Sequence, residues 1–268
     1  MKSRRGFKMA LYDEIGFNYD ETRQPDPYLV QGLIKHLKMK DTYKYLDLAC
    51  GSGNYTTTLA EKGEMYGIDI SDVMITSAKK KNTNVNWFLG NVEKLPFEDN
   101  MFQGAICTLA IHHFDALYSA FCEVFRVLNQ GNFVIFTSTK EQMENYWLNE
   151  YFPLAMKASI QQMPSLDLIV QNLKKAGFTS IQTDLYHVNN ELQDLFLYSG
   201  KNRPEIYLNP QIRAGISTFA NLAMQDEIEA GCKRLSADIN SGKIDNIINS
   251  SKNEMGDYLF VIASKENH

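Results

Sequence analysis

The sequence has few cysteines and no excess of basic residues. Its four cysteines form no CxxC pair and show no metal-ligand spacing, so we expect buried thiols in a reducing cytoplasm and no metal site. The 27 basic and 32 acidic residues leave a net charge of −5, which argues against a broad nucleic-acid surface. A zinc module, a redox module and a nucleic-acid-binding domain are therefore disfavoured interpretations.

Long apolar segments are absent as well. The chain has no run of about 18 apolar residues, so we expect no transmembrane helix and no membrane partner. The N-terminus is basic, but no apolar segment of signal-peptide type follows it, and we expect a cytoplasmic protein. The 268 residues, 44% of them hydrophobic, are sufficient for a substantial core.

The sequence does contain an apolar segment that runs directly into a glycine loop. Residues 45–48 (YLDL) read as a short buried strand, residues 49–53 (ACGSG) follow at once, and helical spacing begins at Tyr55. Such a loop directs backbone N–H groups and the positive end of a helix dipole towards a ligand, and Gly51 allows close approach. By itself, the pattern is equally compatible with an ordinary β-to-α turn.

Four more apolar segments alternate with helical patterns up to Ser138. Five strands alternating with helices over about a hundred residues predict a parallel, doubly wound sheet. Sheets of this kind bind ligands beyond the carboxyl ends of their strands. Asp47, Asp69, Asn91 and His112 all fall at such ends, so we expect them along one edge of the sheet.

The residues at this edge distinguish between nucleotides. Asp69 lies 22 residues after Asp47, where a carboxylate can accept both hydroxyls of a ribose. Thr56 occupies the third position of a G-x-G-x-x-G pattern, and Asp47 is a poor neighbour for a pyrophosphate but a good one for an ammonium group. No Gly-Lys-Ser/Thr follows, which excludes a P-loop. S-adenosylmethionine combines a ribose, a positive group and a carboxylate, and we predict it as the cofactor.

Five motifs occur in a telling order, namely LDLACGSG, YGIDIS, GNVEKLPF, FQGAICTLAIHHF and FRVLNQG. In this order the chain resembles the class I S-adenosylmethionine-dependent methyltransferases, in the style of the ubiquinone/menaquinone-biosynthesis type (methyltransferase type 11). The resemblance covers roughly residues 45–139. It implies a Rossmann-like α/β fold with a seven-stranded sheet, whose last strand is antiparallel and inserted between the fifth and sixth. It also implies methyl transfer to an acceptor by in-line displacement.

The resemblance assigns the methionine end of the cofactor to Asp47 and the glycine loop, with Asp69 on the ribose. Ala49 replaces the usual first glycine of the motif. Because alanine carries a side chain, we expect the backbone at Ala49 to lie farther from the ligand than in relatives. Gly51 is retained, so the resemblance still implies a cofactor pocket at this loop.

The resemblance also implies an adenine site on the next two strands. Ile70 would pack on the adenine ring, while Asn91 and Val92 would meet its edge. Asn91 replaces a common aspartate, and its amide oxygen can still accept from the adenine amino group. Gln103 replaces the usual acid after Phe102, a change that we expect to be structural.

Two groups of residues are candidates for the chemistry. We expect His112 and His113, after the fourth strand, to supply a base and a packing residue, with His113 facing the acceptor; both histidines capping the loop is the alternative. Arg23 can pair with the methionine carboxylate, and Tyr12 or Tyr19 can place an aromatic face against the sulfonium. Simple packing of this N-terminal segment on the domain is an equally open interpretation.

Patterning divides the chain into four parts. We expect an N-terminal lid segment with the first helix over 1–40, a cofactor-binding core over 41–139, a helical substrate cap over 140–165 and 190–250, and the remaining core helix and strands over 166–189 and 257–264.

The cap is expected to recognise the substrate, and its longest helix is expected over 215–242. An aromatic helical cap suits a small, partly apolar acceptor, although aromatic residues at helical spacing also suit a core. The candidate substrate residues are Trp147, Tyr151, Tyr198, Tyr207 and Arg213.

We therefore predict a small-molecule methyltransferase that acts as a monomer or homodimer. An RNA or protein methyltransferase is the first alternative, and the acidic net charge counts against it. A non-catalytic S-adenosylmethionine-binding module is the second, because several motif positions are altered.

Overall fold

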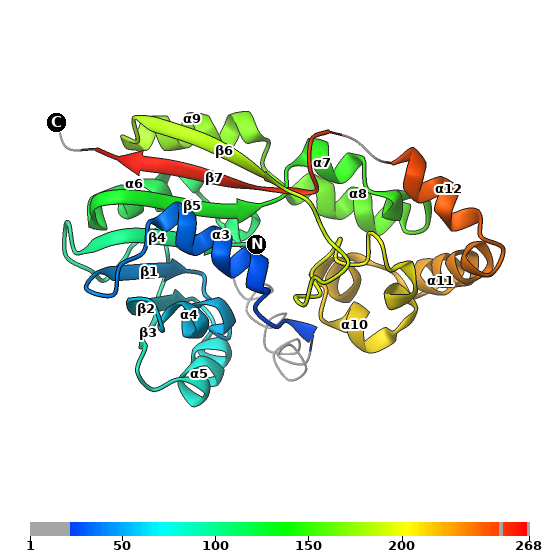
Figure 1. Ribbon diagram of the computed structural model, residues 1–268, viewed down its shortest axis with the longest axis horizontal. Coiled ribbons are helices and arrows are strands. Elements are labelled where there is room, and N and C mark those ends of the chain that lie inside the picture. The colour runs from blue at the N-terminus through cyan, green and yellow to red at the C-terminus, as the bar shows by residue number, and fades with distance from the viewer. Residues whose placement is uncertain (1–21, 252–253, 267–268) are drawn as a thin grey trace, which may run out of the picture.

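The computed structural model describes residues 22–251 and 254–266. A sheet with helices on both faces forms one part, and a helical region extends from one end of it (Figure 1). The sheet part consists of α3 (Pro27–Leu37), β1 (Lys44–Leu48), α4 (Asn54–Leu59), β2 (Glu64–Asp69), α5 (Asp72–Lys81), β3 (Asn86–Leu89), β4 (Phe102–Thr108), η1 (Ile111–His113), α6 (Leu117–Val127), β5 (Leu128–Thr137), α9 (Leu166–Ala176), β6 (Ser180–Tyr186) and β7 (Tyr258–Lys265).

The seven strands lie in the order β3-β2-β1-β4-β5-β7-β6. β7 is antiparallel to both of its neighbours, β5 and β6, while the pairs among β1 to β5 are parallel. The predicted Rossmann-like α/β fold is thus confirmed, with the last strand antiparallel and placed between the fifth and sixth strands. The carboxyl ends of β1, β2 and β4 meet at one edge, as parallel pairing requires.

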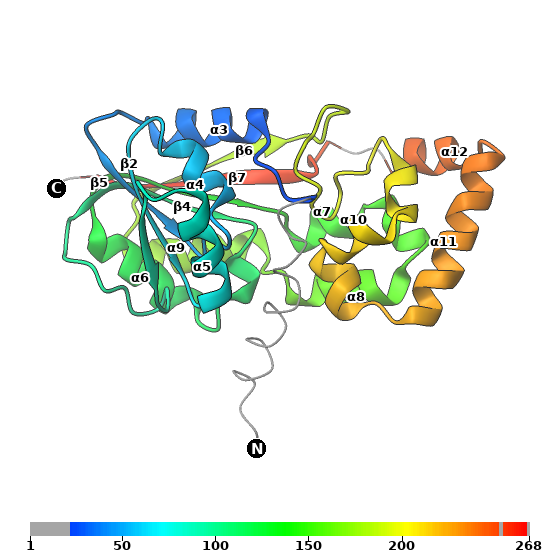
Figure 2. The same ribbon diagram turned by 90° about the horizontal axis from the view of Figure 1, so that it is seen from below.

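Both faces of the sheet are buried, because successive side chains of its central strands point to opposite sides. In β5, Phe133 and Ile135 belong to one hydrophobic cluster, and Val134 and Phe136 belong to the other. Figure 2 shows α3 on one side of the sheet, with α6 and α9 on the other. This double cover explains why the strands read as nearly continuous apolar runs.

The helical region is built from segments on either side of α9 and β6. Its first helices follow β5 directly, and its second group fills the chain between β6 and β7 (Figure 1). Its elements are α7 (Lys140–Glu144), η2 (Trp147–Glu150), α8 (Pro153–Gln162), η3 (Pro204–Leu208), α10 (Pro210–Ala214), η4 (Thr218–Leu222), α11 (Gln225–Asn240) and α12 (Lys243–Ser250).

The helix expected over 215–242 is interrupted in the structure. Residues 218–222 form a π-helical turn, η4, and the regular helix α11 begins only at Gln225. Two buried contacts hold the turn against α8. The hydroxyl groups of Thr218 and Ser159 lie 2.9 Å apart, and the rings of Phe219 and Phe152 pack edge to face at 4.9 Å between centroids. These tertiary contacts override the local helical pattern.

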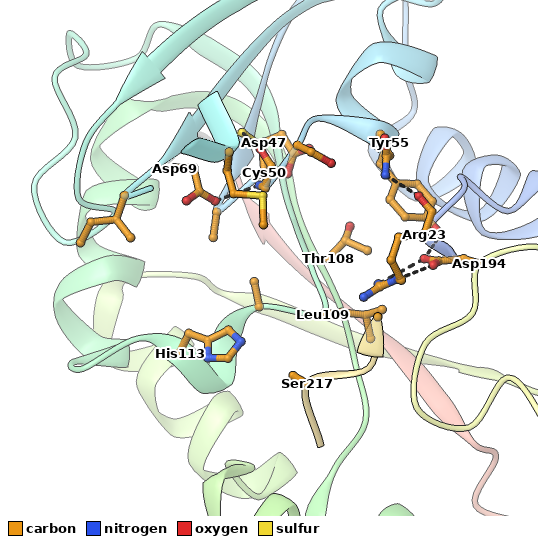
Figure 3. A pocket seen from close by; sticks show the side chains of 18 residues that line it. Arg23, Asp47, Cys50, Tyr55, Asp69, Thr108, Leu109, His113, Asp194 and Ser217 are labelled. Carbon is orange, nitrogen blue, oxygen red and sulfur yellow. Dashed lines mark hydrogen bonds and ion pairs between the residues drawn. The ribbon is translucent and has the colours of Figure 1, made fainter. Parts of the chain in front are cut away.

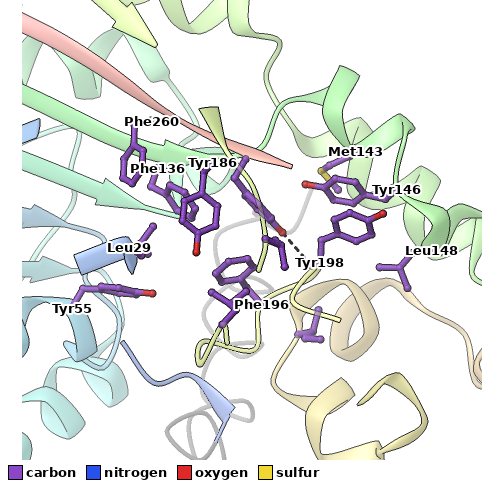
Figure 4. Packing of buried hydrophobic residues seen from close by; sticks show 14 of the residues in the cluster. Leu29, Tyr55, Phe136, Met143, Tyr146, Leu148, Tyr186, Phe196, Tyr198 and Phe260 are labelled. Carbon is purple, nitrogen blue, oxygen red and sulfur yellow. Dashed lines mark hydrogen bonds between the residues drawn. The ribbon is translucent and has the colours of Figure 1, made fainter. Parts of the chain in front are cut away.

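The sheet and the helical region share one hydrophobic core (Figure 4). Phe136 of β5 packs on Tyr258 of β7, and Tyr258 in turn packs on Phe196. Beyond them, the rings of Tyr146 and Tyr198 stack with centroids 3.8 Å apart. Because this core is continuous, the position of the helical region relative to the strand ends is fixed by packing. In the part of the chain that the structure describes, no helix has the length and apolar character needed to cross a membrane.

Candidate active site

A cavity lies at the carboxyl ends of β1, β2 and β4, where the sequence places the candidate site (Figure 3). It encloses about 1070 Å³ of empty space, part of which is open to solvent. The β1–α4 loop, the tip of β2 and the β4–η1 turn form its walls on the sheet side. Arg23, Asp194 and Ser217 close it from the N-terminal segment and the helical region.

The two glycines of the β1–α4 loop have different structural roles. Gly51 has a φ of +55°, and a Cβ added there would meet no atom within 4 Å, so its missing side chain leaves open space at the cavity. At Gly53, with a φ of +75°, an added Cβ would lie 2.2 Å from the Trp87 ring. Gly51 therefore permits ligand approach, whereas Gly53 permits close packing of the Trp87 ring against the start of α4.

Ala49 takes up a backbone conformation that usually favours glycine. Its φ is +51°, in the left-handed region, at a cost of about 1–2 kcal/mol for a residue with a side chain. Ala49 lines the cavity, as does Leu109, another non-glycine residue in this region, with a φ of +54°. The loop thus keeps its tight turn despite the alanine, and two strained residues lie at the same site.

Asp69 holds the glycine loop against the tip of β2. Its carboxylate accepts hydrogen bonds from the backbone N–H of Gly51 at 2.8 Å and from that of Ser71 at 2.9 Å. Burial raises the pKa of Asp69, and the two N–H donors oppose that rise. The side chain lines the cavity at the predicted edge, on the strand next to that of Asp47.

Asp47 is a buried carboxylate in the wall of the same cavity, with 3% of its surface exposed. Burial raises its pKa to about 7, and the charge of nearby Asp69 acts in the same direction. The Thr56 hydroxyl donates to Asp47 at 2.6 Å and opposes the rise. Thr56, the residue that breaks the dinucleotide pattern, therefore orients Asp47. A cation in the cavity would favour the ionised carboxylate.

Arg23 reaches the cavity from the N-terminal side and is held by Asp194. The Arg23 Nε donates to Asp194 Oδ1 at 2.5 Å, and the Tyr55 hydroxyl donates to Asp194 Oδ2 at 2.9 Å (Figure 3). Sequence reasoning missed both partners. Tyr55 had a usable signal, because it follows the glycine loop directly. Asp194 had none, since it lies 171 residues from Arg23 in an irregular segment.

A second cavity, of about 530 Å³ of empty space, adjoins the first. The two share Arg23, Leu109 and Ser217 in their walls. The histidines of η1 divide between them, because His113 lines the first cavity and His112 lines the second. Their rings lie 3.9 Å apart between centroids. The sequence predicts that His113 is the residue nearer an acceptor, whereas the structure places His112 in the wall of the second cavity.

The expected adenine residues are only partly brought together. Ile70 lines the first cavity with 61% of its surface exposed, an exposure suited to covering a flat ring. Asn91 and Val92 are not in the cavity wall. The Asn91 side chain accepts from the backbone N–H of Glu93 at 2.9 Å, and Val92 is buried in the core on the α6 side.

Four candidate substrate residues prove to be structural. Trp147, Tyr151 and Tyr207 are at most 2% exposed and pack in the core of the helical region. Their polar atoms bond within the protein; for example, the Trp147 indole N–H donates to the Lys201 carbonyl at 3.0 Å. Arg213 donates to the carbonyl of Tyr207 and lines neither cavity. The substrate assignment of these four is therefore corrected, because their aromatic and helical pattern marks a core.

The wall of the second cavity is formed instead by residues without a sequence signal. They are mainly small hydroxyl and flexible apolar side chains that converge from β5, α7, α8, η4 and the irregular segment before η3. Examples are Ser138, Met143, Ser159, Met163, Phe196 and Thr218. Tyr12 and Tyr19 lie outside the described residues. Within the described part, no group of three or more His, Cys, Asp or Glu side chains is arranged to hold a metal ion.

Comparisons with known proteins agree with this geometry. Residues 46–136 match a family model described as a methyltransferase domain. A demethylmenaquinone methyltransferase of Lactococcus lactis subsp. lactis (strain IL1403) is 27% identical over 206 residues, which cover 64% of this chain and 82% of that protein.

Solved structures extend the likeness beyond the sheet. A crystal structure from Anabaena variabilis ATCC 29413, described as a methyltransferase from an antibiotic biosynthesis pathway, is 32% identical with a TM-score of 0.82. The match covers 90% of this chain and 98% of that one. Phosphoethanolamine N-methyltransferase 2 of Haemonchus contortus, in complex with S-adenosyl-L-methionine, shares the fold at 18% identity and a TM-score of 0.59, over 95% of this chain and 57% of that one.

The predicted family, fold and cofactor are thereby confirmed. A cavity at the strand ends, walled by two carboxylates and a glycine loop, occurs in a chain that resembles the Anabaena methyltransferase over nearly its full length. The chain belongs to the class I S-adenosylmethionine-dependent methyltransferases, of the type that includes the demethylmenaquinone methyltransferases.

Proposed function

We propose that this methyltransferase transfers its methyl group by in-line displacement to a small-molecule acceptor held in the second cavity. The observation that carries the proposal is the shared wall, because Arg23, Leu109 and Ser217 border both cavities. Two ligands in adjoining cavities would be close enough to react. Good orientation alone can lower the activation barrier by about 7–11 kcal/mol.

The residues of the first cavity fit the cofactor. Open space at Gly51 admits a ligand against the loop backbone, and the buried Asp47 carboxylate would pair with the positive methionine end. Asp69 would hold the ribose and Ile70 would cover the adenine, while Arg23 would pair with the carboxylate. S-adenosylmethionine supplies a methyl group bonded to a positively charged sulfur. The protein residues bind and orient it and keep water out of the junction.

The second cavity favours a compact acceptor that carries little charge. Its wall combines the hydroxyl groups of Ser159 and Thr218 with apolar Met143 and Phe196, between the sheet and the helical region. We propose the helices of 140–165 and 190–250 as the substrate cap. His112 is the candidate base, because it lines this cavity and a histidine can accept a proton near neutral pH.

An aromatic alcohol of the quinol type is the acceptor class to test first. The support is the name of the Lactococcus relative, a demethylmenaquinone methyltransferase. A cavity of about 530 Å³ between the sheet and the proposed cap suits such a molecule better than an RNA or a protein. The four free cysteines support our further proposal of a cytoplasmic enzyme, which we expect to act as a monomer or homodimer.

The test combines calorimetry with radiolabelled methyl transfer. We expect S-adenosylmethionine and S-adenosylhomocysteine to bind, and label to pass to a soluble quinol but not to bulk tRNA. His112→Asn should lower kcat by about a hundredfold and leave cofactor affinity unchanged. His113→Asn should chiefly weaken binding of the cofactor. Binding without turnover on quinols, phenols, amines and thiols would identify a non-catalytic module, and label in tRNA would overturn the small-molecule assignment.

A further inference from the structure

Asp194 belongs to the irregular segment between β6 and η3, yet its side chain forms part of the cofactor cavity wall. It is 1% exposed, and its two carboxylate oxygens are bonded to different parts of the molecule. Oδ1 accepts from Arg23 Nε, and Oδ2 accepts from the Tyr55 hydroxyl and lies 3.4 Å from Arg23 Nη2. The carboxylate thus joins the N-terminal segment to α4, the helix that follows the glycine loop.

Backbone contacts fix this arrangement from both sides. The N–H of Leu195 donates to the Thr22 carbonyl at 2.9 Å, which pairs the residues next to Asp194 and Arg23. The side-chain amide of Asn54, at the start of α4, donates to the Arg23 carbonyl. Three segments therefore meet at one ion pair. A side chain held on both backbone and side-chain atoms keeps one orientation, as positioning a ligand requires.

The charges around the cavity indicate what this ion pair does. Asp47 and Asp69 already supply two carboxylates, so a third anion in the wall would repel the carboxylate of the cofactor. Asp194 instead contacts the Nε and Nη2 side of the Arg23 guanidinium. Figure 3 shows the other end of the guanidinium directed into the cavity. An arginine oriented in this way presents donors to a second carboxylate.

We propose that Asp194 is a positioning residue that orients Arg23 towards the carboxylate of the methionine group. The inference rests on the proposed cofactor site and adds a residue from the cap segment to it. It also has a consequence for the cap. Asp194 lies in the segment that continues into Phe196 and Leu197 of the second cavity, so the segment that orients Arg23 also forms part of the wall of that cavity.

The test compares three probes that differ at the methionine end. S-adenosylhomocysteine carries both amino and carboxyl groups, its deamino analogue keeps only the carboxyl group, and methylthioadenosine has neither. Asp194→Asn should raise the dissociation constants of the first two probes by about tenfold, as expected for loss of a charge-assisted hydrogen bond. The dissociation constant of methylthioadenosine should change by less than about twofold. Arg23→Gln should give the same pattern, and the double variant should lose no more than Arg23→Gln alone.

Asp257→Asn is the matched control, since it breaks an equally buried ion pair. Asp257 bonds to Lys201 Nζ at 2.7 Å, is 3% exposed and lines neither cavity, so all three probes should bind as in the unaltered protein. If Asp194→Asn fails to fold, Tyr55→Phe removes one donor to Asp194 and should show the same probe pattern at about threefold.

If Asp194→Asn weakens the binding of all three probes equally, its role is purely structural and the proposal is overturned. Loss confined to S-adenosylhomocysteine, with the deamino analogue unaffected, would show that Asp194 contacts the amino group and would overturn it as well. Failure of the proposed cofactor site is distinguishable, because the unaltered protein would then bind none of the three probes.

Discussion

The two adjoining cavities are built in different ways from different parts of the chain. The cofactor cavity depends on backbone geometry, since the turns after β1, β2 and β4 place Gly51, Asp69 and Leu109 at one edge. The second cavity, proposed for the acceptor, depends on side chains that converge from many separate segments of the sheet and the helical region. The first is a property of the fold, and the second can change with the cap while the fold remains.

The cofactor cavity and the helical region differ in their electrostatics as well. The cofactor cavity contains buried carboxylates whose pKa values burial raises, so the ligand-free protein bears a cost for them. The helical region has an aromatic core in which the Tyr207 hydroxyl, for example, is paired within the protein. Stability and ligand binding should therefore respond separately to substitutions in the two regions.

The largest expected effect is on stability, in the cap. Trp147→Ala should lower the free energy of unfolding by about 3–5 kcal/mol, because it empties a site in contact with Tyr151 and Tyr207. Urea denaturation measures the loss. Below the unfolding transition, the dissociation constant for S-adenosylhomocysteine should stay within about twofold. Tyr118→Ala, at a 39% exposed aromatic residue, is the control and should be nearly neutral. A parallel loss of cofactor affinity in Trp147→Ala would show that the regions are not separable.

Asp47→Asn should have the opposite effects, a large loss of cofactor affinity without a loss of stability. It removes the carboxylate expected to pair with the positive methionine end, so S-adenosylmethionine should bind about a hundredfold more weakly, or ~2.7 kcal/mol. At pH 8 the same substitution should raise the melting temperature of the ligand-free protein, because a buried charge is removed. Calorimetry and thermal unfolding measure the two effects. Asp72→Asn, at an exposed acid of α5, should change neither. A destabilised Asp47→Asn protein would contradict the assignment.

The pH dependence of binding follows from the same carboxylate. Between the ordinary value of 3.8 and about 7, the folded protein holds a proton on Asp47 that the unfolded chain has lost. This contribution to stability is therefore present at low pH and is lost as the pH rises through about 7. Cofactor binding should have the reverse dependence, weakening by up to about tenfold per pH unit below pH 7 as Asp47 is protonated.

Titration calorimetry in buffers of different ionisation enthalpy checks this linkage. Below pH 7 it should detect one proton released for each cofactor bound, and above pH 8 almost none. Asp47→Asn should bind weakly at every pH. A pH-independent affinity in the unaltered protein would mean that Asp47 does not contact the charged end.

The smallest expected effect is at Ala49. Ala49→Gly relieves the positive φ of +51° but adds freedom to the unfolded chain, so the net stabilisation should be about 0.5–1 kcal/mol. Cofactor affinity should change by less than about twofold, since the loop already has the required turn. Denaturation midpoints and calorimetry measure both. Lower stability in Ala49→Gly would show that the alanine methyl group packs favourably.

Much of the sheet part could be read from the sequence. The strand ends at Leu48 and Asp69 follow from short apolar runs broken by polar and glycine residues, because parallel strands buried on both faces leave that pattern. The same reasoning could not predict the partner of Arg23. Asp194 belongs to a segment without periodicity, so only the path of the chain brings the two together.

The sequence by itself determined five strands that alternate with helices, the edge that carries the candidate site, and the cofactor that suits two acids and a glycine loop. Its resemblance to a known family added the seven-stranded sheet. These features depend on neighbouring residues, namely short apolar runs that end in an acid or a glycine loop, and on the order of the motifs along the chain. Only the tertiary structure decided that Trp147 and Tyr207 are core, that His112 lines the second cavity, and that an acid of the irregular segment before η3 holds Arg23. The reason is physical: an aromatic pattern signals burial without naming what it is buried against, and a cavity is what the packing leaves unfilled.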